Sequence, residues 1–149
     1  TRTKYGTNGF FIIRNDLSKV DISYLQCVNG ASTKLSDIKA ACRTSIRLVI
    51  SDVQNKVNYG IDKCQFTGEI LTRKNTHIDH YNLKFNDLFK KWIKGKDVDY
   101  LFSQLNDTSI DLVNDIYFEN SEIRNDFVDY HNKNTNLRAI SKTANLKLG

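Results

Sequence analysis

An aspartate directly precedes a histidine at the end of Thr76–His80, whose sequence is Thr-His-Ile-Asp-His. A carboxylate beside an imidazole can pair a cation ligand with a general base, because an unperturbed imidazole takes up a proton near neutral pH. Near the C-terminus, Asn136 and Asn145 supply neutral oxygens that can ligate a cation or orient a ring without adding charge. Together these residue types suit a cation-assisted hydrolysis, in which a base activates water and the cation stabilises developing negative charge.

These segments resemble the HNH nuclease motif, in which Asp-His lies on a strand and is followed by Asn-Leu and by a closing Asn on a short helix. The corresponding residues here are Asp79-His80, Asn136-Leu137 and Asn145. The upstream turn, Cys64-Gln65-Phe66-Thr67-Gly68, is similar to the Cys-x-x-Cys-Gly turn that opens many HNH domains, with its second Cys replaced. The resemblance implies a metal-dependent DNA endonuclease.

The resemblance also implies a role for each motif residue. Asp79 and Asn145 would ligate one divalent cation, and oxygen ligands favour Mg²⁺ or Mn²⁺. His80 would be the general base, and Asn136 would hold its ring. His77 is either a third ligand, a phosphate contact or a surface histidine. Since adjacent strand residues point to opposite faces, Asp79 and His80 converge only if the backbone twists or a loop folds over.

Zinc-bearing HNH domains hold one structural zinc between two Cys-x-x-Cys turns. Here the first turn is Cys64-x-x-Thr67 and the second is Ser141-x-x-Ala144, so a single thiolate remains of four. This pattern argues against structural zinc. It predicts that packing holds the two turns together.

Composition bounds the protein class. A chain of 149 residues forms one domain, or one domain with an extension. It has no apolar run of about 18 residues, which argues against a membrane partner, and no visible signal peptide. Cys27, Cys42 and Cys64 are too few and too scattered for a disulfide framework, which favours a reducing, cytoplasmic compartment. The start at Thr1 indicates a fragment or a processed chain.

Residues 1–60 are predicted to form a β-hairpin and a long helix. The hairpin strands lie near residues 9–14 and 20–25. Residues 10–16 and 21–27 are similar to part of the DCL-type domain of plant plastid proteins. Residues 32–58 are predicted to be one helix, with an apolar stripe that also makes Cys42 a core residue. The stripe consists of Leu35, Ile38, Cys42, Val49, Val53 and Val57.

The predicted fold class is α+β, in two parts. Residues 1–60 pack on residues 61–149, which form a ββα-metal (HNH-like) core with a helical insertion at about 83–135. Amphipathic patterns in the insertion predict a helix at 83–93, one or two over 101–117 and a last one at 127–130. The closing helix is expected to turn Leu137, Ile140, Ala144 and Leu148 toward the core.

The net charge is +5, with basic ends around an acidic segment at 97–129. This distribution predicts a DNA partner, although ordinary surface charge gives the same pattern. Two alternatives stay open: a catalytically silent nucleic-acid-binding module on the same fold, and a protein-interaction module that uses the acidic helices. The candidate DNA-backbone contacts are basic residues of the long helix and of the closing helix, namely Lys39, Arg43, Arg47, Arg138, Lys142 and Lys147.

Overall fold

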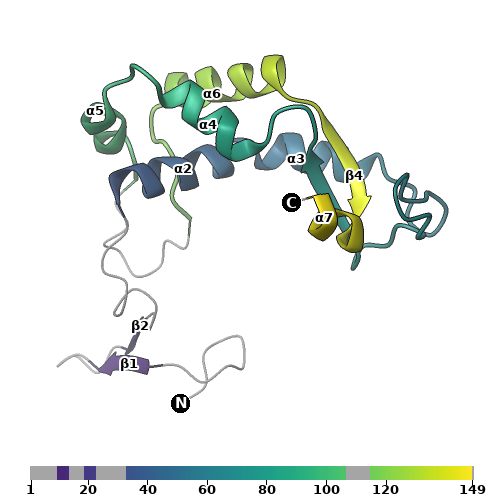
Figure 1. Cartoon of the computed structure of the whole chain (residues 1–149). Coiled ribbons are helices and arrows are strands. Elements are labelled where there is room, and N and C mark those ends of the chain that lie inside the picture. Colours follow the sequence, from purple (N-terminus) through teal and green to yellow (C-terminus); the bar gives the residue numbers. More distant parts are fainter. Residues whose placement is uncertain (1–9, 14–18, 23–32, 107–114, 149) are drawn as a thin grey trace.

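The computed structural model describes residues 10–13, 19–22, 33–106 and 115–148. The described chain is α+β, as predicted, with its strands in two separate two-stranded antiparallel sheets (Figure 1). In chain order the elements are β1 (Phe10–Ile13), β2 (Lys19–Ile22), α2 (Lys34–Ser45), α3 (Arg47–Asn55), β3 (Thr76–His80), α4 (Phe85–Ile93), α5 (Val98–Ser103), α6 (Ser121–Asn134), β4 (Leu137–Ser141) and α7 (Lys142–Leu148).

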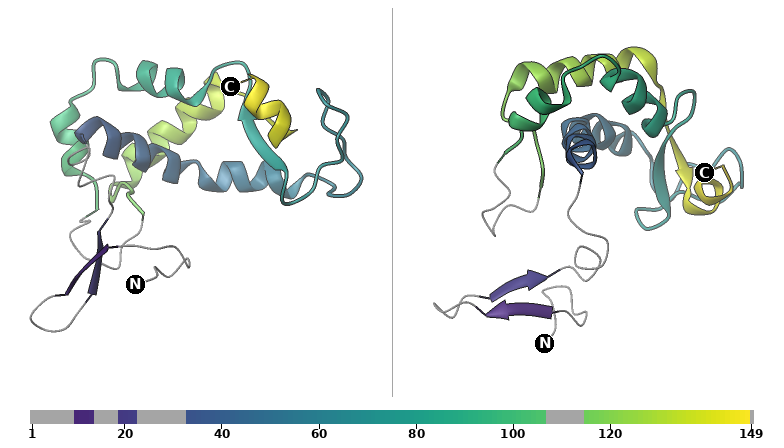
Figure 2. Two further views of the ribbon diagram at one scale, coloured as in Figure 1. Left: turned by 60° about the horizontal axis from the view of Figure 1, so that its bottom comes forward. Right: turned by 60° about the vertical axis from the view of Figure 1, so that its left-hand side comes forward.

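The predicted N-terminal hairpin is confirmed. Strands β1 and β2 pair antiparallel, with Phe10 opposite Ile22 and Ile13 opposite Lys19. Figures 1 and 2 show both strands away from the helices. The predicted packing of the hairpin on the C-terminal core is therefore not seen among the described residues.

The single long helix predicted over 32–58 is wrong, because the helix breaks at Ile46 into α2 and α3. The hydroxyl of Thr44 donates to the Ala40 carbonyl, and that of Ser45 donates to the Ala41 carbonyl. Such bonds to the preceding turn compete with the backbone ladder and bend helices. The side chain of Thr33 caps the start of α2 by accepting from the Ser36 amide.

Helices α2, α4, α5 and α6 enclose the larger of two cores. Ile38 and Cys42 are fully buried, as the stripe predicted, whereas Leu35 is 46% exposed. Burial also raises the pKa of the Cys42 thiol, which makes Cys42 a packing residue rather than a nucleophile. The buried members of this core are Ile38, Ala41, Cys42, Ile46, Leu88, Phe89, Trp92, Leu101, Phe118 and Phe127.

The insertion is helical at α4, α5 and α6. Of the one or two helices predicted over 101–117, the first corresponds to α5, which ends at Ser103, and residues 107–114 lie outside the described residues. Leu105 instead forms an isolated antiparallel bridge with Phe118. The Asn106 side chain accepts from the Tyr117 amide at 2.8 Å and donates to the Asp115 carbonyl at 3.2 Å. These bonds satisfy backbone groups that a longer helix would have used.

Strand β3 carries Asp79 and His80, as the motif resemblance implies, and β4 pairs with it so that Thr76 faces Ser141 and His80 faces Leu137. The prediction of a closing helix that includes Leu137 and Ile140 is therefore wrong, since α7 begins only at Lys142. Helix α7 contacts both strands, and Figure 1 shows this ββα unit at one end of the molecule. Leu148, expected in the core, is 41% exposed.

A second, smaller core lies beneath this unit and contains Cys64, Leu71, Ile140 and Ala144. The predicted turn at 64–68 is confirmed, because the Gly68 amide donates to the Cys64 carbonyl at 2.8 Å. Gly68 has a φ of 71°, which favours glycine at this position. Across the described residues, no helix is long and apolar enough to cross a membrane.

Candidate active site

Three of the four predicted motif residues, Asp79, His80 and Asn145, line a cavity of about 370 Å³ at the end of β3. Asp79 and His80 both line it, although neighbouring residues on a strand point to opposite faces. Asn145 reaches the same cavity from α7. The remaining lining residues come from α2, β3 and the start of α4, namely Arg43, Ile78, Lys84, Phe85 and Asn86.

The Asp79 carboxylate is held by Arg138, which lies opposite it in the β3–β4 register. Both Nε and Nη2 of Arg138 donate to the same oxygen, Oδ2, at 2.9 and 2.8 Å. The two side chains are only 13% and 24% exposed, so solvent screens this pair less than a surface pair. No described residue donates a hydrogen bond to Oδ1, which leaves that oxygen available as a ligand.

Two aromatic rings fix the Arg138 guanidinium. Its Cζ lies 4.5 Å from the centroid of Phe66 and 4.8 Å from that of Tyr81. Guanidinium groups stack well on aromatic faces, so the rings and Asp79 together define one orientation. Arg138 was predicted to contact DNA phosphates, and the structure places its guanidinium on Asp79 instead.

His80 bonds to a second histidine that comes from α6. The Nε2 atoms of His80 and His131 are 3.1 Å apart, and His131 Nδ1 lies 3.0 Å from Asn132 Oδ1. A carboxamide oxygen only accepts, so His131 carries its proton on Nδ1 and its Nε2 accepts from His80. His80 is therefore protonated on Nε2, and its Nδ1 keeps a lone pair that can take a proton.

Burial keeps this histidine pair uncharged. Desolvation, followed by the proximity of His131, lowers the pKa of His80 to about 4, while Asp79 acts in the opposite direction. Burial also lowers the pKa of His131, which is 1% exposed. His80 is thus a neutral base at neutral pH.

The lowered pKa of His80 predicts a stability that depends on pH. The unfolded chain binds a proton at His80 near pH 6.5, whereas the folded chain does so only near pH 4, so unfolding becomes easier as the pH falls between these values. We expect His80→Gln, which cannot titrate, to lose less stability than the parent protein between pH 7 and pH 5. Urea unfolding at both pH values measures this difference. Equal losses in the two proteins would show that His80 is not held neutral.

The residue that holds the His80 ring by a hydrogen bond is one that the sequence did not indicate. The side chain of Asn136 is exposed, and its backbone amide donates to Asn82 Oδ1 at 2.6 Å. His131, on α6, contacts His80 in place of Asn136. The one signal in the sequence was the histidine count, because all three histidines of the chain lie at or beside this site.

His77 orients the carboxamide of Asn145. The Asn145 amide nitrogen lies 3.1 Å from His77 Nδ1, and since an amide nitrogen only donates, the imidazole nitrogen accepts. No described residue donates to the carbonyl oxygen of Asn145. The motif therefore leaves one oxygen of Asp79 and one of Asn145 for a ligand.

A cation here would have few protein ligands. The described residues contain no group of three or more His, Cys, Asp or Glu side chains placed to bind a metal. The oxygens of Asp79 and Asn145 nonetheless suit Mg²⁺, which keeps several waters and is often held by one or two carboxylates plus substrate phosphates. The residues present fit such an open site.

The basic residues predicted to contact DNA from the long helix now lie on two helices, with Lys39 and Arg43 on α2 and Arg47 on α3. The Arg43 guanidinium lies 4.7 Å from the centroid of Phe85, and Lys39 Nζ lies 6.0 Å from that of Phe89. Arg47 instead forms two hydrogen bonds to Asp115, which raise its pKa and offset its charge. Lys142 and Lys147 are exposed on α7. Neither lines the cavity that contains Asp79 and His80, which we call the motif cavity, nor the cavity beside it between α2 and α4.

The turn that begins at Cys64 is joined to the start of α7. The hydroxyl oxygens of Thr67 and Ser141 lie 3.0 Å apart, and the Ser141 oxygen accepts from the Ala144 amide. Burial alone would raise the pKa of Cys64, but hydrogen bonds from Ser141, Thr67 and Phe66 lower it to about 6. Hydrogen bonds and apolar packing thus hold the turn at Cys64 against the turn at Ser141, as predicted from the sequence.

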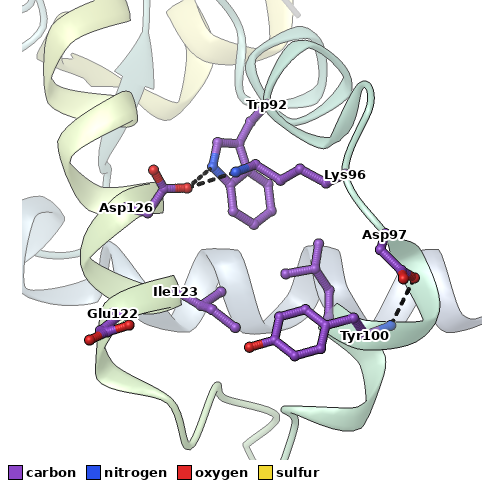
Figure 3. Close-up of a pocket in the computed structure, with 8 residues that line it drawn as sticks. Trp92, Lys96, Asp97, Tyr100, Glu122, Ile123 and Asp126 are labelled. Atoms are coloured by element: carbon purple, nitrogen blue, oxygen red, sulfur yellow. Dashed lines mark hydrogen bonds and ion pairs between the residues drawn. The ribbon is translucent and has the colours of Figure 1, made fainter.

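A second cavity, of about 320 Å³, lies in the helical body and has a different character (Figure 3). Its wall includes the apolar side chains of Leu101 and Ile123. Asp126 accepts from the Trp92 indole and from Lys96, both at 2.9 Å. Three carboxylates line this cavity, those of Asp97, Glu122 and Asp126, so it does not suit a phosphate.

No family model, no curated protein and no solved structure matches this chain. Its function must therefore be inferred from the geometry of its own residues.

Proposed function

We propose that this protein is a metal-dependent DNA endonuclease of the HNH type, which hydrolyses phosphodiester bonds at Asp79, His80 and Asn145. The observation that carries the proposal is their convergence on one cavity from β3 and α7. The order strand, strand, helix is the one that the motif resemblance implies. A binding module would have no need of a carboxylate and a neutral imidazole at the same cavity.

Asp79 Oδ1 and the Asn145 carbonyl oxygen would hold one divalent cation, Mg²⁺ or Mn²⁺. When bound, such an ion stabilises negative charge on the phosphoryl group and on the leaving oxygen. The fixed pairing of Asp79 Oδ2 with Arg138 supports this role, because ligating carboxylates are commonly oriented by hydrogen bonds to their other oxygen. His77 likewise orients Asn145, because it accepts a hydrogen bond from the amide nitrogen and leaves the carbonyl oxygen for a ligand.

His80 would take the proton from the attacking water. Its Nδ1 lone pair is available because Nε2 donates to His131. The ring is further restrained by Phe85, whose centroid lies 5.7 Å away at a steep angle. The low pKa ensures that the base is unprotonated, although a weak base transfers protons less readily than one with a pKa near the working pH.

Basic side chains of the protein would contact the scissile phosphate. Arg43 and Lys84 line the same cavity as His80. Lys84 Nζ also donates to the Leu148 carbonyl at 2.6 Å, which ties the start of α4 to α7. Positive groups fixed in place stabilise developing negative charge without rearrangement.

Incubation with supercoiled plasmid DNA tests the proposal. With Mg²⁺ or Mn²⁺ we expect nicked or linear products, and with chelator we expect none, because the cation supplies the charge stabilisation. Gel electrophoresis over time measures the conversion. Cleavage that persists in excess chelator, or no cleavage with any divalent cation, would contradict the proposal.

One observation favours the alternative of a catalytically silent nucleic-acid-binding module on the same fold. Arg138 already neutralises Asp79, as an arginine would if the carboxylate had become structural. Retained DNA binding without cleavage under every metal condition would select this alternative.

A further inference from the structure

We infer that one strand of the DNA substrate follows a groove between α2 and α4, with its phosphates along Lys39, Lys90 and Arg43, and so reaches the Asp79–His80 site. This inference rests on the proposed function and adds the path of the substrate. It starts from a third cavity, also of about 370 Å³, that adjoins the cavity lined by Asp79 and His80. Arg43 and Asn86 line both cavities, so the two lie side by side between α2 and α4.

The charge of this groove suits a phosphate backbone. The cavity beside the site is lined by Lys39, Arg43 and Lys90 and by no carboxylate. The motif cavity adds Lys84, and Asp79 is its single acidic residue. By contrast, three carboxylates line the cavity of Figure 3. A polyanion would therefore be attracted along α2 and α4 and repelled from the acidic helices.

The cations of the groove are held over α4 by aromatic rings. Phe89 is buried beneath Lys39, and Phe85 lies beneath Arg43. Because these faces are covered by cations, the rings orient charge and are not open to stack with bases. Lys39 and Arg43 are four residues apart on α2, which sets them about 6 Å apart along the helix axis. The groove thus offers successive contacts to phosphates and no evident base readout.

Two other basic residues are excluded from this path because each is already paired with a carboxylate. Arg47 follows Arg43 by one turn but is paired with Asp115. Arg138 is paired with Asp79. Lys90 has one carboxylate neighbour, Asp87, at 3.7 Å and on the exposed side of α4, a pair that contributes little in water. Lys39 and Lys90 are thus the phosphate contacts to test, because they line the end of the groove that is remote from Asp79 and His80.

The test compares Lys39→Ala/Lys90→Ala with a control of equal charge, Lys56→Ala/Lys94→Ala, whose residues are exposed and line neither cavity. Fluorescence anisotropy with a labelled single-stranded oligonucleotide, in chelator, measures affinity from low to moderate salt. We expect the groove variant to bind more weakly and its log–log salt slope to flatten by about 1.4, since each lost single-strand contact removes about 0.7. The control should keep the parent's slope.

A second readout separates this inference from the proposed function. Bis(p-nitrophenyl) phosphate is small enough to occupy the site alone, so the groove variant should lose less activity on this substrate than on the oligonucleotide, for which its KM should rise. If the parent cleaves DNA and the groove variant binds like the control at every salt concentration, the path is wrong and the nuclease stands. If the groove variant loses binding but the parent cleaves nothing, the path stands and the hydrolysis is wrong.

Discussion

Replacing His80 with alanine is expected to lower kcat for DNA cleavage by about 10²–10⁴-fold, the usual contribution of a positioned general base. The ring is the neutral imidazole at the motif cavity, and its Nδ1 has the lone pair that the reaction requires. DNA affinity measured in chelator should change little, because a base acts on the transition state and contributes little to ground-state binding. Initial rates on plasmid DNA, with circular dichroism to verify the fold, measure the effect.

Two matched variants identify the base. His131→Ala removes the acceptor of the His80 Nε2 proton, so the ring loses its fixed orientation and an intermediate loss is expected. His77→Ala leaves that pair intact and removes the contact to Asn145 instead. Full activity of His80→Ala would move the base to one of these two histidines. The ranking of the three variants therefore tests the assignment itself.

The parts of this fold that the sequence predicted are those with a local cause. Strand β3 has β-branched and alternating residues, and the turn at 64–68 ends in a glycine with positive φ. Ile38 and Cys42 follow a helical period, so their burial could be predicted. Each of these features is encoded within a few residues.

The features that were missed depend on partners far away in the chain. Residues 137–141 include helix-forming Leu, Arg and Ala, and they become β4 because β3 pairs with them across more than fifty positions. The contact between His80 and His131 depends on how α6, the last helix of the insertion, packs against α4. Arg138 could be matched with Asp79 only once the strand register was known. The helix break at Ile46 would have been easier to predict, since it follows directly after Thr44 and Ser45, whose hydroxyls bond to the preceding turn.

Replacing Asp79 with alanine should remove metal-dependent cleavage altogether, down to the rate seen in chelator. The carboxylate is the single acidic group that lines the motif cavity, so no other side chain there can replace its charge toward a divalent cation. Titration calorimetry with Mn²⁺ should show binding to the parent protein and none to the variant. Cleavage by Asp79→Ala at the parent's rate, with the same metal dependence, would show that the site lies elsewhere.

Arg138 allows the structural role of Asp79 to be separated from its chemical role. Asp79→Ala leaves the half-buried guanidinium without its acceptor, which costs about 1–3 kcal/mol of folding free energy. Asp79→Ala/Arg138→Met removes both charges and should regain most of that stability in urea unfolding, yet no cleavage should return. Arg138→Met alone keeps the ligand but not its orientation, and its kcat should fall by about 10–100-fold, as for other partners of ligating groups. If the double variant regains cleavage together with stability, Asp79 acts only as the acceptor for Arg138.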